Sequence, residues 1–249
     1  MSGRWFATVA GSLVLLAVMA FGAAPVAQAK GLPANDRRVV ATSVGGTQIV
    51  ARHYGALDAP VQLVILGQMH GSEPGGRKVV AELAAMQPPA GVGLWLVSSM
   101  NPDGDRVHGR ANAHGVDLNR NFPADWAAAG RNGPFWSGPR ASSEPETRGM
   151  VRFLGEVRPT ALISYHQAFD VVDISHPRSV DAGRRLARWM GEQARAVPCS
   201  GPCHGTLTQW VDQALGAIAI TVELDDRVSD AEARRAATAV LRLGRWLGG

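Results

Sequence analysis

Two short polar clusters carry residue types that bind metal ions. Gly67-Gln68-Met69-His70-Gly71-Ser72-Glu73 directly follows the apolar run Val61–Leu66. His70 and Glu73, three residues apart in a Gly-flanked turn, can converge on one zinc ion, although His-x-x-Glu alone is a weak signal. A second apolar run ends at Ser164-Tyr165-His166-Gln167, so His166 can complete a set of two His and one Glu. That set leaves a fourth position for water, which is typical of catalytic zinc.

Two further clusters supply a carboxylate and cationic groups. Glu223 ends the apolar run Ala217–Leu224. A buried Glu is costly without a partner or a task, and its raised pKa suits proton transfer. Arg110, Asn119 and Arg120 lie in a segment without clear periodicity, and they suit anion recognition because guanidinium groups pair bidentately with carboxylates.

Alternating patterns predict the elements that must hold these residues. Val39–Val44 and Gln48–Tyr54 flank Gly45-Gly46 and predict a hairpin. The pattern predicts further strands at Val61–Leu66, Val92–Val97, Thr160–Tyr165 and Ala217–Leu224, and helices from Glu73-Pro74 to Pro88, near Glu144–Gly155, Val180–Ala196 and Ser229–Leu247. This order predicts a single-domain α/β/α sandwich with a mixed, mostly parallel sheet and a site at strand carboxyl ends. Residues Ser98 to Arg140 have little periodicity, and so long an irregular segment indicates function.

The N-terminal residues indicate export. Arg4 precedes an apolar run from about Phe6 to Phe21 that is short for a membrane span, and Ala27-Gln28-Ala29 has the small-x-small pattern of a signal-peptidase site. We expect a signal peptide at residues 1–29 and a catalytic domain at residues 30–249, exported to the periplasm or the medium, without a stable membrane span after cleavage. A retained membrane anchor is the alternative.

Charge and cysteine content narrow the remaining classes. The formal net charge is +4, and removing the leader with Arg4 lowers it to +3. Lys and Arg never run beyond adjacent pairs, so we expect no nucleic-acid partner. The only cysteines, Cys199 and Cys203, lack the further ligands of a structural zinc site, which favours a local disulfide in an oxidising compartment.

These clusters and their order resemble the M14 metallocarboxypeptidase family from about Val61 to Leu224. The most specific piece is Gly-Val-Asp-Leu-Asn-Arg-Asn-Phe-Pro at residues 115–123, between His-x-x-Glu and the later His. The resemblance implies one zinc ion per chain held by His70, Glu73 and His166. It also implies that Asn119 and Arg120 hold the free carboxylate of a peptide substrate.

The same resemblance assigns the two remaining roles. Arg110 would stabilise the oxyanion, and Glu223 would be the general base and later the acid that protonates the departing amine. Asp225 and Asp226 are alternative bases, but they fall beyond the apolar run.

Within the family, three segments resemble the murein peptide amidase A-like branch, which cuts the γ-D-glutamyl–diaminopimelate bond of cell-wall peptides. They are Arg110-Ala111-Asn112-Ala113, Ser143-Glu144-Pro145-Glu146-Thr147, and Gly205-Thr206-Leu207 leading to Trp210. Two departures matter. Digestive carboxypeptidases cover the substrate with a Tyr, but residues 167–222 of this chain contain no Tyr, and His204 is a candidate substitute for it. The second departure is the export signal, because recycling of murein peptides takes place inside the cell.

Other functions fit the sequence less well. A deacylase of the aspartoacylase/succinylglutamate desuccinylase type shares Gly-x-His-Gly-x-Glu and Asp-Leu-Asn-Arg, but Asn101-Pro102-Asp103-Gly104 favours a peptidase. A non-catalytic binding module on the same fold is a further alternative, although every expected ligand and the base are present. A serine hydrolase is disfavoured because no Gly-x-Ser-x-Gly occurs. The sequence leaves side-chain specificity and oligomeric state open.

Overall fold

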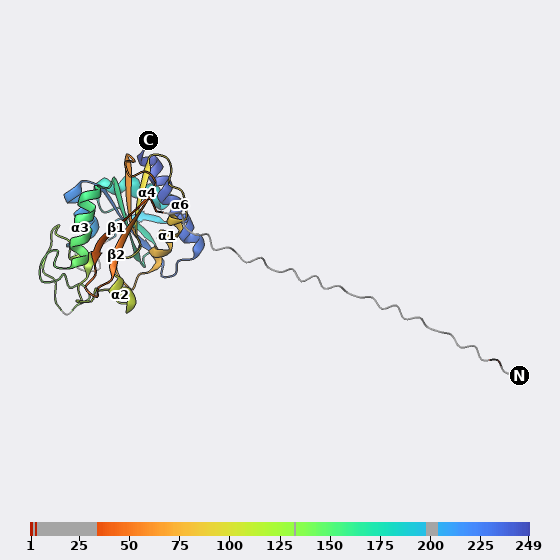
Figure 1. The fold of residues 1–249 in the computed structure, drawn as a ribbon, viewed down its shortest axis with the longest axis horizontal. Coiled ribbons are helices and arrows are strands. Elements are labelled where there is room, and N and C mark those ends of the chain that lie inside the picture. The colour runs from red at the N-terminus through yellow and green to blue at the C-terminus, as the bar shows by residue number, and fades with distance from the viewer. Residues whose placement is uncertain (2, 4–33, 132, 198–203) are drawn as a thin grey trace.

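The computed structural model describes residues 1, 3, 34–131, 133–197 and 204–249. This part of the chain forms one eight-stranded sheet with helices on both faces (Figure 1). The predicted leader, apart from residues 1 and 3, and the predicted Cys199–Cys203 disulfide lie outside the described residues. None of the helices described is both long and apolar enough to cross a bilayer.

The sheet is mixed, with its parallel strands at the centre. Its strand order is β1-β2-β4-β3-β5-β8-β6-β7. The neighbours β4, β3, β5 and β8 run parallel to one another, whereas β1 and β2 pair antiparallel at one side and β6 pairs antiparallel with β8. The strands are β1 (Asp36–Thr42), β2 (Gln48–Tyr54), β3 (Val61–Leu66), β4 (Val92–Val97), β5 (Ala161–Gln167), β6 (Val171–Asp173), β7 (Gln193–Arg195) and β8 (Ile218–Leu224).

Helices bury both faces of this sheet. One core cluster joins the strands to α1 (Gly75–Ala84), α4 (Val180–Met190) and α6 (Asp230–Leu247). The other joins them to α3 (Pro145–Val157) and α5 (Leu207–Trp210), and Figure 1 shows α3 on the opposite side of the sheet from α1 and α6. The short helix α2 (Pro102–Arg106) belongs to the irregular segment. This arrangement confirms the predicted α/β/α fold class.

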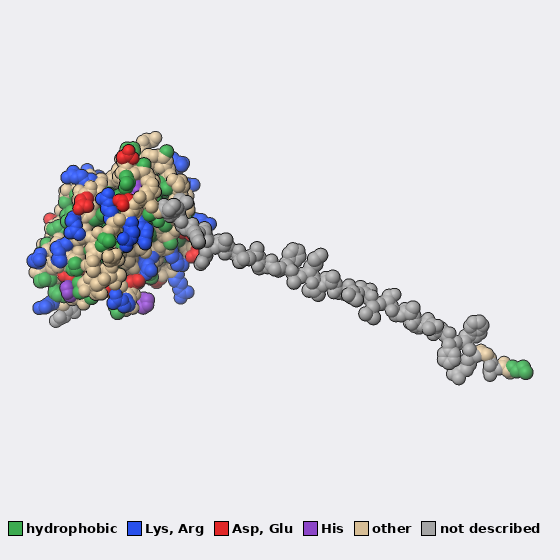
Figure 2. Space-filling model, in the orientation of Figure 1, with side chains coloured by type: hydrophobic (Ala, Val, Ile, Leu, Met, Phe, Trp, Pro, Cys, Tyr) green, Lys and Arg blue, Asp and Glu red, His purple; other side chains and the backbone are tan. Residues whose placement is uncertain are grey.

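The apolar run of β3 shows why central strands lack polar alternation. Leu63 and Ile65 belong to the core on the α1 side, while Val64 and Leu66 belong to the core on the α3 side, and all four are fully buried. A strand covered on both faces must be apolar at every position. No charged side chain therefore lies in this strand. Figure 2 shows Lys and Arg on the surface, scattered among acidic and apolar side chains.

The predicted helix Val180–Ala196 is too long. It ends at Met190, because Gly191 takes a positive φ of 83° as its C-cap and its amide bonds the carbonyl of Ala187. The chain then forms β7, whose partner β6 was also not predicted. Both strands are only three residues long, too short to show a period of two.

Sheet register brings the chemically important strand ends together. The parallel strands β3, β5 and β8 all end at one edge. Leu66 of β3 pairs with Ser164 of β5, and His166 pairs with Glu223 of β8. The turn that follows β3 carries His70 and Glu73 over the same edge, so the fold positions these residues as the predicted site requires.

Candidate metal centre

A tight turn between β3 and α1 presents His70 and Glu73 to the same point. The amide of Glu73 donates to the carbonyl of His70 at 3.0 Å and closes the turn. The amide of Gly75, at the start of α1, donates to the side-chain oxygen of Gln167 at 2.7 Å. Because Gln167 follows His166 on β5, this bond fixes the turn against the strand that carries the second imidazole.

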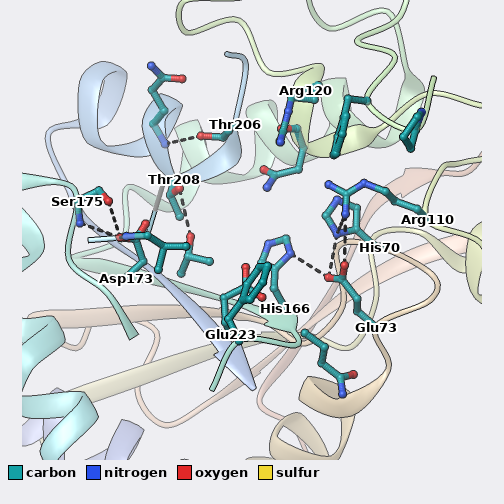
Figure 3. Close-up of a pocket in the computed structure, with 18 of the residues that line it drawn as sticks. His70, Glu73, Arg110, Arg120, His166, Asp173, Ser175, Thr206, Thr208 and Glu223 are labelled. Carbon is teal, nitrogen blue, oxygen red and sulfur yellow. Dashed lines mark hydrogen bonds and ion pairs between the residues drawn. The ribbon is translucent and has the colours of Figure 1, made fainter. Parts of the chain in front are cut away.

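The three predicted ligands converge. His70, Glu73 and His166 are buried, and each offers a ligand atom within 4.8 Å of the others. Glu73 Oε2 lies 2.8 Å from Nδ1 of His70 and 3.0 Å from Nδ1 of His166 (Figure 3). Two imidazole nitrogens and one carboxylate oxygen form the ligand set of catalytic zinc sites.

The outer nitrogens of both imidazoles show which atoms face the centre. His70 Nε2 lies 3.0 Å from Oδ1 of Asp117, a carboxylate that can only accept. His166 Nε2 lies 3.3 Å from Ser164 Oγ. With Nε2 protonated, the Nδ1 lone pair of His70 faces a carboxylate oxygen, and this contact is favourable only with a proton or a cation between them. The residues therefore fit a metal ion.

Asp117 is the principal residue to which the sequence analysis gave no role. It is fully buried, and Oδ2 accepts from Nε and Nη2 of Arg110 at 3.0 and 2.9 Å while Oδ1 faces His70. One carboxylate thus orients a candidate ligand and the predicted oxyanion residue. Its position in Gly-Val-Asp-Leu-Asn-Arg could have indicated this, since imidazole ligands commonly donate their other N–H to a carboxylate.

For His70, Glu73 and Asp117, contacts with neighbouring charged and polar groups shift the pKa more than burial does. Burial alone would lower the pKa of His70, but the carboxylates of Asp117 and Glu73 raise it above its ordinary value. Burial alone would raise the pKa of Glu73, but hydrogen bonds with His166 and His70 hold it well below its usual range. Asp117 has a strongly lowered pKa because His70 and Arg110 outweigh its desolvation. The cluster is a set of compensated charges.

Glu223 lines the same cavity and is partly rather than fully buried. Its Oε2 is enclosed and has no hydrogen-bond partner within the part of the chain described. Burial raises its pKa, and the nearby carboxylate of Glu73 adds to this, while His166 opposes it. An unpaired carboxyl with a raised pKa, beside the candidate ligands, suits a general base.

The two arginines and Asn119 line the cavity near this centre. Nη1 of Arg110 lies 3.4 Å from Glu73 Oε1. Arg120 donates from Nη1 to the carbonyl of Asn119 at 2.8 Å, and its buried Nε has no partner among the residues described. Asn119 Oδ1 accepts from the amide of Leu207 at 3.0 Å. No described residue accepts from its side-chain amide, which can therefore donate to a ligand.

Two of the three segments singled out in the sequence, residues 110–113 and 143–147, meet each other in space. Asn112, next but one to Arg110, donates to Glu144 Oε2 at 2.8 Å and to Glu146 Oε2 at 3.2 Å. All three side chains are buried. This junction anchors the loop that carries Arg110 to the start of α3, so these sequence motifs act on the site through its scaffold.

The cavity has a volume of about 370 Å³ and extends beyond the predicted residues. Its further lining includes Phe135, Asp173, Ser175, His176 and Thr208. Figure 3 shows Asp173 and Ser175 on the far side from Arg110 and Arg120. Sequence reasoning missed Phe135, Asp173, Ser175 and His176 because they lie in a short strand and in loops with no motif around them. Thr208 lies in α5, within the segment from Gly205 to Trp210, but was not singled out as a lining residue.

The alternative candidates lie elsewhere. Asp225 and Asp226 are exposed and do not line the cavity; their carbonyls accept from Gln167 Nε2 at 2.6 and 3.0 Å. His204, the candidate substitute for a substrate-covering Tyr, is exposed and also does not line it. Of the three candidate bases Glu223, Asp225 and Asp226, Glu223 alone lines the cavity with the candidate ligands.

Sequence comparisons point to one family. A sequence model of the zinc carboxypeptidases, peptidase family M14, matches residues 90–231. Murein peptide amidase A of Escherichia coli (strain K12) is 31% identical over 163 residues, which cover 61% of this chain and 66% of that amidase. Carboxypeptidase SOL1 of Arabidopsis thaliana is 32% identical over 124 residues, 45% of this chain and 24% of that protein. The comparisons support the predicted enzyme class, a metallocarboxypeptidase-type hydrolase.

A solved structure supports the fold. The murein-tripeptide amidase from Escherichia coli O157 superposes with a TM-score of 0.71 at 24% identity, covering 87% of this chain and 94% of that one. At this identity the likeness concerns the fold alone. The agreement extends over nearly the whole of that chain, so the sheet and its covering helices are shared.

If Asp117 orients His70, Asp117→Asn will weaken zinc binding. We expect the dissociation constant of zinc, measured by competition with a chelating dye, to rise by roughly 10–100-fold, as is typical for such supporting carboxylates. Asp103→Asn is the matched control, because Asp103 is also buried but accepts from the amide of Gly45 at 2.7 Å. Equal zinc affinity in both variants would remove Asp117 from this role.

Proposed function

The chain belongs to the zinc carboxypeptidase family M14, and from this premise we propose that it is a zinc-dependent hydrolase that cuts an amide bond next to a free carboxylate. The observation that carries the proposal is the convergence of His70, Glu73 and His166 within 4.8 Å in a cavity that Glu223 and Arg120 also line. A ligand set, a base and an anion site therefore share one space.

His70, Glu73 and His166 would hold the zinc ion. A zinc ion there would polarise the substrate carbonyl and make water more acidic. The remaining steps fall to side chains of the chain itself. Arg110, held at Nε and Nη2 by Asp117, keeps Nη1 near the centre and would donate to the oxygen on which negative charge develops.

Glu223 would move the proton. Its raised pKa and unpaired Oε2 suit a carboxylate that accepts a proton from water as the water oxygen bonds to the carbonyl carbon. The same carboxyl then gives this proton to the amide nitrogen as the carbon–nitrogen bond breaks. The pairing of His166 with Glu223 in the sheet supports this role, because it sets the base beside a candidate ligand.

Arg120 and Asn119 would select a substrate with a free carboxylate. Burial lowers the pKa of Arg120, as does the positive charge of Arg110, while Asp117 opposes both. A carboxylate at its unpartnered Nε would offset the cost of burying that cation. The side-chain amide of Asn119 can add a further hydrogen bond.

We further propose that the substrate is a cell-wall peptide cut at a γ-D-glutamyl–diaminopimelate bond. The similarity to murein peptide amidase A supports this, and so does the cavity. Among the described residues, Asp173 receives three hydrogen bonds, all at Oδ1, from Ser175 N, Ser175 Oγ and Val197 N. Its Oδ2 is left for a cation, so the cavity offers opposite charges to a residue that carries both an ammonium and a carboxylate.

The export of the enzyme is also a proposal, supported by the leader pattern at residues 1–29. The enzyme would then act on envelope or environmental peptides. Mature protein isolated from outside the cytoplasm should begin at Lys30, and an intact N-terminus there would count against cleavage.

Glu223→Gln tests the base. Glutamine keeps the shape of the side chain but cannot accept a proton, so turnover should fall by roughly 10²–10⁴-fold. Zinc content should stay at the wild-type level because the three ligands are untouched. Asp225→Asn is the control and should keep its turnover, since that carboxylate is exposed and outside the cavity. Near-normal turnover of the Gln variant, or loss of zinc from it, would contradict the assignment.

A substrate panel tests the bond. Purified zinc enzyme should release diaminopimelate from L-Ala-γ-D-Glu-meso-diaminopimelate faster than it cleaves N-acyl dipeptides, with products identified by mass spectrometry. Amidation of the carboxylate beside the bond, or Arg120→Ala, should lower kcat/KM by a factor that corresponds to a loss of about 2–5 kcal/mol of transition-state stabilisation. Equal rates on free and amidated peptides would overturn the carboxylate requirement. Preference for N-acyl amino acids would instead indicate a deacylase.

A further inference from the structure

One aromatic ring contacts both arginines of the cavity. The Cζ atom of Arg110 lies 5.3 Å from the ring centroid of Phe135, and that of Arg120 lies 5.4 Å from the same centroid. Both distances fall within the roughly 6 Å range of a cation–π contact. Phe135 also lines the cavity, so this contact lies at the site itself.

The backbone around Phe135 is tied to the motif that builds the site. The carbonyl of Trp136 accepts from the amide of Asp117 at 2.8 Å. The carbonyl of Ser137 accepts from Asn121 Nδ2 at 2.8 Å and from Trp126 Nε1 at 3.1 Å. These bonds fix the position of the ring relative to Asp117, which in turn holds Arg110.

The Phe135 ring stabilises two guanidinium groups of like charge that line the same cavity. Arg110 and Arg120 are like charges that line one cavity, but among the described residues only Arg110 has carboxylate partners, Asp117 and Glu73. Arg120 bonds a neutral carbonyl instead. The negative face of an aromatic ring attracts a guanidinium group without neutralising it, so both cations keep their charge for a ligand.

We propose that Phe135 is a positioning residue that holds Arg110 toward the metal centre and Arg120 toward the substrate carboxylate. The inference rests on the proposed function, because it takes a substrate carboxylate as the ligand of Arg120. Loss of the ring would let the guanidinium of Arg120 rotate and hydrate, and a carboxylate would then have to order it again on binding.

The first measurement is independent of activity. Protons of a guanidinium group above a ring are shifted upfield by its ring current, so the Nε–Hε resonances of Arg110 and Arg120 should be displaced in the wild type. Phe135→Leu should move both toward ordinary positions, and Phe135→Tyr should leave both displaced. Resonances that do not respond to Phe135→Leu would overturn the contact.

The second measurement is affinity for a carboxylate, made in zinc-loaded protein carrying Glu223→Gln so that the peptide is not consumed. The probes are L-Ala-γ-D-Glu-meso-diaminopimelate and its counterpart amidated at the carboxylate next to the bond. Phe135→Leu should raise the dissociation constant of the free acid by about 5–30-fold, the range expected for one desolvated cation–π contact. Phe135→Leu should leave the dissociation constant of the amidated peptide nearly unchanged. Phe135→Tyr should restore the wild-type ratio between the dissociation constants of the two peptides.

Phe169→Leu is the matched control. Phe169 is 53% exposed and lines the same cavity, but its ring contacts neither arginine. This variant should keep the wild-type ratio of the two affinities. An equal loss for both peptides in Phe135→Leu would mean that the ring packs on the substrate, and would overturn the proposal. A wild type that does not distinguish the two peptides would instead count against the proposed function.

Discussion

The site is organised around two imidazole nitrogens and a carboxylate oxygen that face one another at hydrogen-bond distance in a buried place. Glu73 Oε2 lies within 3.0 Å of both Nδ1 atoms, while the outer nitrogen of His70 faces Asp117. Electron pairs that face one another away from water repel unless a positive charge lies among them. The sheet, the turn after β3 and the surrounding loops together hold this arrangement in place.

Asp117 transmits that constraint to the rest of the cavity. Its two oxygens are divided between His70 and Arg110, and its amide holds the carbonyl of Trp136, which fixes Phe135. A buried carboxylate is stable only when its charge is compensated, and here two cationic or protonated partners compensate it. The metal centre, the oxyanion residue and the aromatic ring are thereby linked through one side chain.

The sequence predicted the parts that follow simple periodicity or a contiguous motif. The central strands are apolar throughout because helices cover both faces, and the strand ends at His166 and Glu223 follow directly from those runs. Asp173 and Phe135 could not be predicted in the same way. Asp173 lies in a three-residue strand. Phe135 lies in an irregular segment, and hydrogen bonds of the neighbouring backbone place its ring beside the two arginines. The predicted end of α4 lay six residues beyond the observed one, because the apolar pattern continues past Gly191. The backbone conformation of Gly191 ends the helix.

The most direct test of this account is X-ray absorption at the zinc edge of protein loaded with one equivalent of zinc. The account predicts two imidazole nitrogens and a carboxylate oxygen at about 2.0–2.2 Å, with His70→Ala removing one of the nitrogens. A sulfur neighbour at about 2.3 Å would assign the metal to the cysteines instead. A shell unchanged by His70→Ala would contradict the claim that His70, Glu73 and His166 form the metal centre.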